Sequence, residues 1–125
     1  MISTEVSKGE GLIRVKISGQ PEPAAIVRML DELNTLVRDD PSLGILIDET
    51  ELRPSFVGPG DIGRFAEVWR RSTALPASRI AVFVTNPAMY GLNRMFQGMA
   101  DETKRIGVFH DRASATVWLG GPEQR

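Results

Sequence analysis

The single histidine of this 125-residue chain, His110, is directly followed by Asp111, and this pair could support acid–base chemistry. A carboxylate beside an imidazole can orient the ring for proton transfer. Ser55 could supply a nucleophile, and the protein would then be a hydrolase. Ser55 lacks the G-x-S-x-G turn that presents a nucleophilic serine, and no second group converges on His110 in the sequence. We therefore predict no catalytic residues and no enzyme, and expect Asp111 to cap the last helix.

Three carboxylates, Asp48, Glu49 and Asp61, could bind a hard cation through their oxygen atoms. Asp61 more simply caps a helix, and acidic residues that follow a strand are common in solvated loops. The stretch GPGDIG at 58–63 has its glycines at the wrong spacing for a phosphate-binding loop. The chain has no cysteine, so thiolate ligands and disulfides do not occur. We predict no metal and no cofactor.

Apolar side chains suggest binding surfaces more clearly than the polar ones do. The first apolar feature lies in a segment expected to be a loop at 49–61. Phe56 and Val57 lie there between proline and glycine residues. An apolar pair in a loop either packs under the loop or contacts something else. Both interpretations remain open from the sequence.

A second apolar feature is the helix expected at 86–102, NPAMYGLNRMFQGMADE. Asn86 is a good N-cap and Pro87 suits the first helical position. At 100° per residue, the apolar side chains share one arc that should face the core: Met89, Leu92, Met95, Phe96, Met99 and Ala100. The opposite side collects Tyr90, Asn93, Arg94 and Gln97, with Tyr90 and Arg94 close enough to touch. Gly91 and Gly98 fall together on one flank, where another backbone, helix or ligand could approach closely.

Buried strands that alternate with helices predict the elements that position these residues. Strands are expected at 2–7, 12–17, 43–47, 80–84 and 106–109. Helices are expected between Pro23 and Asp39, around 62–71, at 86–102 and from 112 to the glycines at 120–121. The predicted fold is α/β: a single domain over residues 1–125, with a mixed, mostly parallel sheet of about five strands and about four helices. The first strand is expected to be antiparallel at an edge, and ligands are expected at the carboxyl ends of the parallel strands.

Composition narrows the class of partner. The formal net charge is −1 and no basic run occurs, which disfavours binding to nucleic acid. No apolar run approaches the roughly 18 residues of a membrane span, and the first residues do not resemble a secretory signal. We expect a cytoplasmic protein with 42% hydrophobic and 25% charged residues, as is ordinary for a globular domain.

Three runs of the sequence resemble the SpoIIAA-like proteins of the STAS superfamily, which contains sulfate transporter and anti-sigma factor antagonist domains. These runs are GILIDETEL, RIAVFVTNPAMYGLNRMFQGMADE and IGVFHDRASATVWLGG, and the resemblance covers roughly residues 10–120. The matching positions are Asp48, Tyr90-Gly91-Leu92, Arg94-Met95-Phe96, Val108-Phe109, Asp111, Ala115, Trp118 and Leu119.

The resemblance implies a non-enzymatic domain that regulates or binds another protein, like the anti-sigma factor antagonists. In those proteins a serine at the start of the helix after the Asp-ended strand is phosphorylated. The corresponding position here falls near 57–58, where no hydroxyl occurs, and Ser55 lies two or three residues earlier. We therefore expect no phosphoserine switch. The SpoIIAA-like branch also resembles lipid-binding CRAL-TRIO folds, which implies an apolar ligand between helices and sheet.

The sequence thus leaves two main functions: a regulatory protein-interaction module, or a carrier of a small apolar, lipid-like ligand. The sequence also leaves open a homodimer, through an open sheet edge or the glycine flank. The ligand pocket is expected to involve Phe56, Phe65, Trp69, Met89, Met95 and Phe96. The full set of candidate partner- or ligand-binding residues is Asp48, Ser55, Phe56, Val57, Gly58, Asp61, Phe65, Trp69, Tyr90, Gly91, Arg94, Met95 and Gly98.

Overall fold

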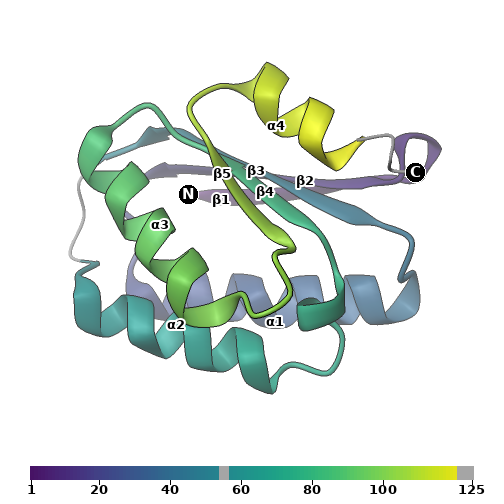
Figure 1. Cartoon of the computed structure of the whole chain (residues 1–125), viewed down its shortest axis with the longest axis horizontal. Coiled ribbons are helices and arrows are strands. Elements are labelled where there is room, and N and C mark those ends of the chain that lie inside the picture. The colour runs from purple at the N-terminus through teal and green to yellow at the C-terminus, as the bar shows by residue number, and fades with distance from the viewer. Residues whose placement is uncertain (54–56, 121–125) are drawn as a thin grey trace.

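The computed structural model describes residues 1–53 and 57–120, which form a five-stranded sheet with helices on both faces (Figure 1). The strands are β1 (Ile2–Ser7), β2 (Leu12–Gly19), β3 (Gly44–Leu52), β4 (Ile80–Phe83) and β5 (Ile106–Phe109). The α-helices are α1 (Pro23–Asp39), α2 (Pro59–Arg71), α3 (Pro87–Ala100) and α4 (Arg112–Leu119). Short 3₁₀ turns, η1 (Lys8–Glu10) and η2 (Leu75–Ala77), precede β2 and β4.

The strands lie in the sheet in the same order as in the chain. β1 is antiparallel to β2, whereas β2, β3, β4 and β5 run parallel. A helix connects each parallel strand to the next, as crossover connections require. The predicted mixed sheet, with its antiparallel first strand at an edge, is confirmed. None of the helices in the described part of the chain is long and apolar enough to span a membrane.

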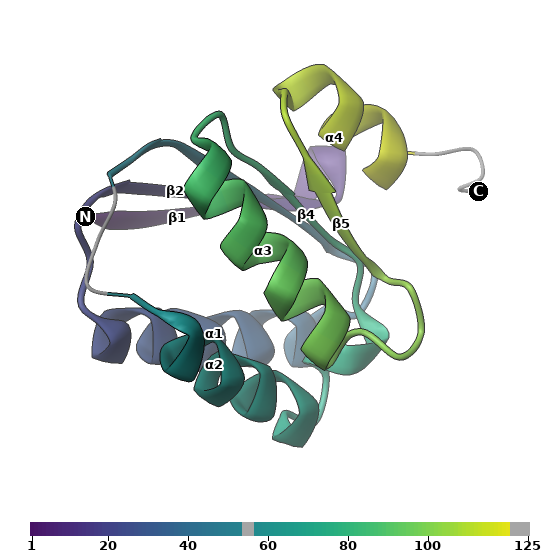
Figure 2. The same cartoon turned by 60° about the vertical axis from the view of Figure 1, so that its left-hand side comes forward.

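The two faces of the sheet carry cores of different size. α1, α2 and α3 cover one face, and α4 lies alone against the other (Figures 1 and 2). The larger core includes Ile13, Ile45 and Ile80, which lie side by side on β2, β3 and β4, together with Leu33 of α1 and Trp69 of α2. The smaller core, under α4, comprises Leu46, Ala81, Phe83 and Ala115, with Phe109, Trp118 and Leu119 packed against it.

β3 is longer than the sequence suggested. The strand was expected to end at 47, with a loop beginning near 49, but it continues through Leu52. The reason is pairing with the end of β2: Ser18 lies opposite Glu51 and Gly19 opposite Leu52, beyond an irregularity between Lys16 and Ser18. Polar residues at 48–51 concealed this extension, because a strand with polar side chains lacks the usual apolar signal.

The orientation of α3 also differs from the helical-wheel prediction. Met89 and Ala100 are buried as expected, and Leu92 and Phe96 pack against the core. The following two predictions are wrong. Met95 and Met99 were placed in the core, yet they are 38% and 44% exposed; Asn93 and Gln97 were placed on the outer side, yet they face inward.

Specific hydrogen bonds explain the orientation of α3. The Gln97 side chain donates from Nε2 to the carbonyl oxygen of Ile106 on β5 (2.6 Å), and Asn93 donates to Glu49 on β3. The buried direction of the helix is therefore shifted from the centre of the apolar arc toward these amides, which moves Met95 and Met99 outward. Met99 then lies against α2, where its methyl group is 3.4 Å from the position that a Cβ on Gly63 would occupy.

Candidate functional site

A partly open apolar cavity of about 90 Å³ lies between the larger sheet face and helices α1, α2 and α3. Its wall is formed by side chains from all three helices and from the central strands, including Met29, Ile47, Phe65, Val82, Met89 and Phe96. These residues come from segments far apart in the chain, and the parallel sheet brings them together. The cavity is therefore a product of the fold and not of any single motif.

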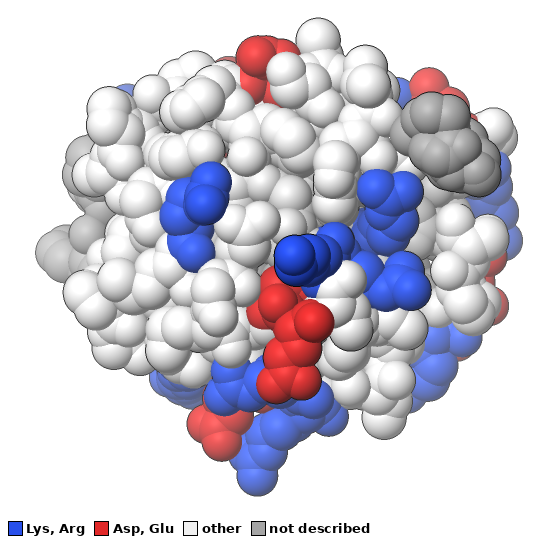
Figure 3. All heavy atoms as spheres, in the orientation of Figure 1, with Lys and Arg blue, Asp and Glu red and all other residues white. Residues whose placement is uncertain are grey.

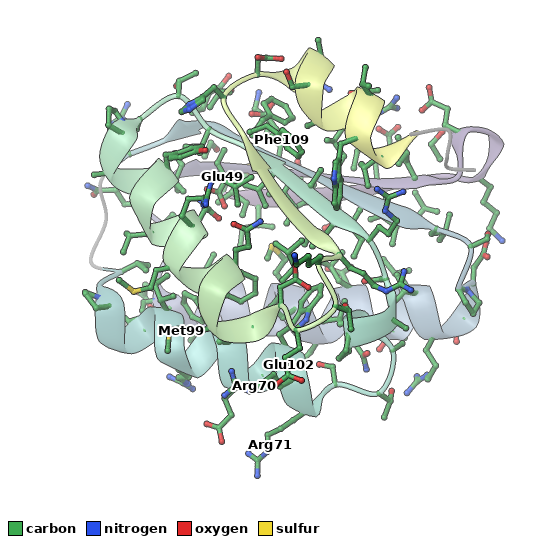
Figure 4. The ribbon with its side chains drawn as sticks, viewed as in Figure 1. Glu49, Arg70, Arg71, Met99, Glu102 and Phe109 are labelled. Atoms are coloured by element: carbon green, nitrogen blue, oxygen red, sulfur yellow. The ribbon has the colours of Figure 1, made fainter. Side chains whose placement is uncertain are left out.

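One ionisable side chain lines this cavity in the described part of the chain. Glu49 lies on β3 and is 9% exposed. Figure 4 shows it between α3 and the strands. Side chains alternate between the two faces of a strand, so Glu49 is on the same face as Ile45 and Ile47. A carboxyl group therefore takes a position on β3 that an aliphatic side chain would ordinarily fill.

Asn93 of α3 is the hydrogen-bond partner of this carboxyl. Its Nδ2 donates to Glu49 Oε1 (2.7 Å) and to the carbonyl oxygen of Met89 (2.9 Å). Both partners are acceptors, which fixes the orientation of the amide. Asn93 also lines the cavity, so the two polar side chains share one part of an otherwise apolar wall.

The environment of Glu49 favours its protonated form. Burial raises the pKa of this carboxyl from 4.5 to about 7; the hydrogen bond from Asn93 opposes the rise, and the negative charge of Asp48 adds to it. Burial dominates because removing a carboxylate from water is costly when no cation replaces the lost solvation. The group is thus close to half-ionised at neutral pH.

Comparisons with known proteins address the fold. No family model matches the chain, and no curated protein matches it by sequence. Among solved structures, an uncharacterised protein of the DUF3478 family from Shewanella loihica PV-4, described as having a SpoIIAA-like fold, superposes with a TM-score of 0.61. The match covers 95% of this chain and 92% of that one, at 19% identity. This chain has a SpoIIAA-like fold. The expected resemblance is confirmed at the level of architecture.

Within this SpoIIAA-like fold, the predicted pocket residues divide into two groups. Phe65, Met89 and Phe96 line the cavity, as does Val57. Trp69 does not: it is 2% exposed in the core and meets the edge of the Phe96 ring at 5.9 Å between ring centres. Met95 is not part of the lining either, because it is on the outer side of α3. The candidates Ser55 and Phe56 lie outside the described residues.

The three carboxylates considered for a metal do not converge. Asp48 points to the opposite face of β3 from Glu49, where it accepts bonds from Thr50 and pairs with Arg112 at 3.4 Å. Asp61 caps α2, as expected, by accepting a bond from the backbone N–H of Gly58 (2.9 Å). No cluster of three potential metal-binding side chains occurs in residues 1–53 and 57–120.

His110, at the end of β5, has an aromatic neighbour that the sequence did not predict. Its ring stacks on Tyr90 of α3, with 4.1 Å between ring centres and an angle of 13° between planes. Tyr90 therefore has a ring partner on the segment after β5 that the sequence did not predict. Asp111 caps α4, as expected, by accepting a bond from the backbone N–H of Ser114 (2.7 Å). Capping of the helix N-terminus is sufficient to explain why an aspartate is found at position 111.

The glycine flank of α3 is an open surface. Among the described residues, a Cβ atom added at Gly91 or Gly98 would meet no atom within 4 Å beyond the adjoining part of its own helix. Arg94 is the single charged residue of α3, and the surface over this helix is largely free of acidic and basic groups (Figure 3). The flank is free for an approaching partner, together with the exposed side chains of Met95 and Met99.

The sequence interpretation missed the central polar pair, Glu49 and Asn93. A usable signal existed for each. Glu49 continues the two-residue spacing of Ile45 and Ile47, which predicts that it faces the same core. Asparagine is a weak helix former, and Asn93 lies inside a helix, four residues after the buried Met89. An asparagine at such a position indicates that its side chain makes a specific hydrogen bond.

Proposed function

We propose that this chain is a non-enzymatic binding protein that holds a small, mostly apolar ligand in the cavity between α3 and the sheet. The observation that carries this proposal is the partly open cavity of about 90 Å³ with an almost entirely apolar wall. Ligand sites are typically concave, apolar and provided with a few polar groups that fix orientation. Glu49 and Asn93 are such groups.

Filling the cavity tests this proposal. Leu92 of α3 lines the cavity, so Leu92→Trp would place an indole inside it. Met95 is three residues further along the same helix and is 38% exposed, so Met95→Trp is the matched control outside the cavity. We expect 1-hexanol, titrated into the protein and followed by amide NMR shifts, to bind the wild type and Met95→Trp but not Leu92→Trp. Hexanol binding that survives in Leu92→Trp would place the ligand elsewhere.

A second candidate function is a regulatory protein-interaction module resembling anti-sigma factor antagonists, without a phosphoserine switch. It is supported by the exposed Met95 and Met99 next to the open positions at Gly91 and Gly98. Methionine side chains adapt to partners of varied shape. If a partner protein binds this surface, its crosslinking to the protein in cells should be lost in Gly91→Glu. The same crosslinked complex should be retained in Val117→Glu. Val117 is the control because it is 70% exposed and lies on α4, against the other sheet face.

We also propose that two copies of the chain pair through β1. β1 is the first strand in the sheet order and pairs within the chain with β2 alone among the described strands. An edge strand with free backbone groups is a template for a further strand.

A further inference from the structure

The polar part of the cavity contains more hydrogen-bond acceptors than donors. Glu49 Oε1 is occupied by the Asn93 amide, whose nitrogen also donates to Met89. Both hydrogens of that nitrogen are therefore used, and Asn93 retains only its Oδ1 acceptor. Among residues 1–53 and 57–120, no donor contacts Glu49 Oε2 or Asn93 Oδ1. Because no described residue donates to these two acceptors, an occupant that carries hydrogen-bond donors fits this site.

The charge of the cavity wall favours a positively charged ligand. Glu49 is the only ionisable residue among the described residues that line the cavity. The single charged side chain of α3, Arg94, is exposed, and so are the ionisable side chains of α1. Those of α2 are exposed as well, except the helix cap Asp61. Asp48, the preceding residue, adds negative charge, so no cation of the described chain balances an ionised Glu49.

We propose that the cavity binds a small apolar amine, with its ammonium group on Glu49 and Asn93 and its hydrocarbon part against the apolar wall. This inference rests on the proposed ligand-binding function. An ammonium group carries donors and no acceptor, and it neutralises the carboxylate. A fatty carboxylate would bring a second negative charge beside Glu49, and an alcohol would donate one hydrogen bond without balancing the charge. Both are expected to bind more weakly.

The size of the cavity limits the buried part of such an amine. An apolar cavity of roughly 150 Å³ can hold benzene. This one, at about 90 Å³, accommodates the amine head and the first part of a chain, and the rest extends through the opening. Linear amines therefore fit better than bulky ring systems.

Hexylamine, 1-hexanol and hexanoate test the inference because they share a chain length and differ in the head group. Each is titrated into the full chain at pH 6 and pH 8, with affinity measured by calorimetry and the site mapped by NMR. Hexylamine is protonated at both values, as a lysine side chain would be. Because the pKa of Glu49 is about 7, its ionised fraction rises about tenfold between these pH values. We expect hexylamine affinity to rise by up to tenfold, hexanol affinity to stay level, and hexanoate to bind most weakly.

Glu49→Gln keeps the shape of the side chain and removes its charge. We expect this variant to lose hexylamine affinity by tenfold or more at pH 8, together with the pH dependence, while hexanol affinity is retained. Glu51→Gln is the matched control, because Glu51 is two residues along β3 with its side chain 60% exposed. The pH series on the wild type tests the inference even where Glu49→Gln does not fold.

Different failures have different meanings. Hexanol or hexanoate binding as tightly as hexylamine at pH 8 would overturn the amine inference and leave the ligand-binding proposal in place. Hexylamine binding that is unchanged in Glu49→Gln would do the same. No binding of any probe to the wild type would overturn the amine inference and the ligand-binding proposal together.

Discussion

At the scale of single residues, Glu49 is the feature that distinguishes this cavity from an ordinary packing defect. An unfilled apolar space in a core needs no carboxyl group beside it, and an aliphatic residue on β3 would fill it better. Burying Glu49 costs free energy because its charged form loses water, and among the described residues it gains one hydrogen bond, from Asn93. A costly group at a cavity wall fits a binding role better than a structural one.

The first prediction concerns the pH dependence of stability. Folding raises the pKa of Glu49 from 4.5 to about 7, so the folded state binds more protons than the unfolded state between these values. The contribution of Glu49 to the free energy of unfolding therefore falls as pH rises through this window and levels off above pH 7. At about 1.4 kcal/mol per pH unit, the loss amounts to about 3 kcal/mol. Glu49→Gln should remove it.

Urea denaturation at pH 5 and pH 8 measures this effect. The decrease in unfolding free energy between the two pH values should be larger in the wild type than in Glu49→Gln. Glu51→Gln should retain the wild-type decrease, since its side chain is exposed. Equal decreases in the wild type and Glu49→Gln would show that Glu49 titrates normally and is not held in the environment described above.

At the scale of elements, α3 combines the two candidate functions on opposite sides. Its inner side presents Met89, Asn93 and Phe96 to the cavity, and its outer side presents Gly91 and Gly98 to open space. A glycine inside a helix weakens the helix, and alanine would stabilise it at both positions without a clash with the described residues. Their presence is therefore unexplained by packing within the described chain and fits a need for close approach from outside.

The second prediction follows from the open space at these glycines. Gly91→Ala and Gly98→Ala should each raise the free energy of unfolding by roughly 0.5–1 kcal/mol, because alanine favours the helix and its methyl group would clash with none of the described residues. Gly107→Ala on β5 is the contrasting control: its Cβ would lie 2.6 Å from the Phe109 ring and should destabilise the protein. Denaturant titration of the three variants measures these changes. Destabilisation by Gly91→Ala or Gly98→Ala would mean that the flank is not open.

At the scale of the whole molecule, the sequence predicted the fold better than the site. Periodic apolar residues such as Ile13, Val15 and Ile17 fix strands and their faces, because core burial selects one register. The cavity depends instead on how α3 rotates over the sheet, and that rotation is set by side-chain amides bonding to β3 and β5. A helical wheel counts hydrophobicity and cannot include a partner on a distant strand, so it placed Asn93 outside and Met95 inside.

The third prediction concerns association through β1. Met1 and Ser18 exchange both backbone hydrogen bonds, so alternation along the antiparallel pair places Thr4 opposite Val15 in a pair without such bonds. The backbone groups of Thr4 therefore point away from β2 and are available to a second β1. Proline is tolerated where an edge strand directs its N–H outward. We expect the wild type to sediment as a dimer at high concentration and Thr4→Pro to fold but remain monomeric.

Ser3→Pro, which removes a bond to β2, should instead lower stability. A wild type that stays monomeric at high concentration, or a Thr4→Pro variant that still dimerises, would exclude pairing through β1.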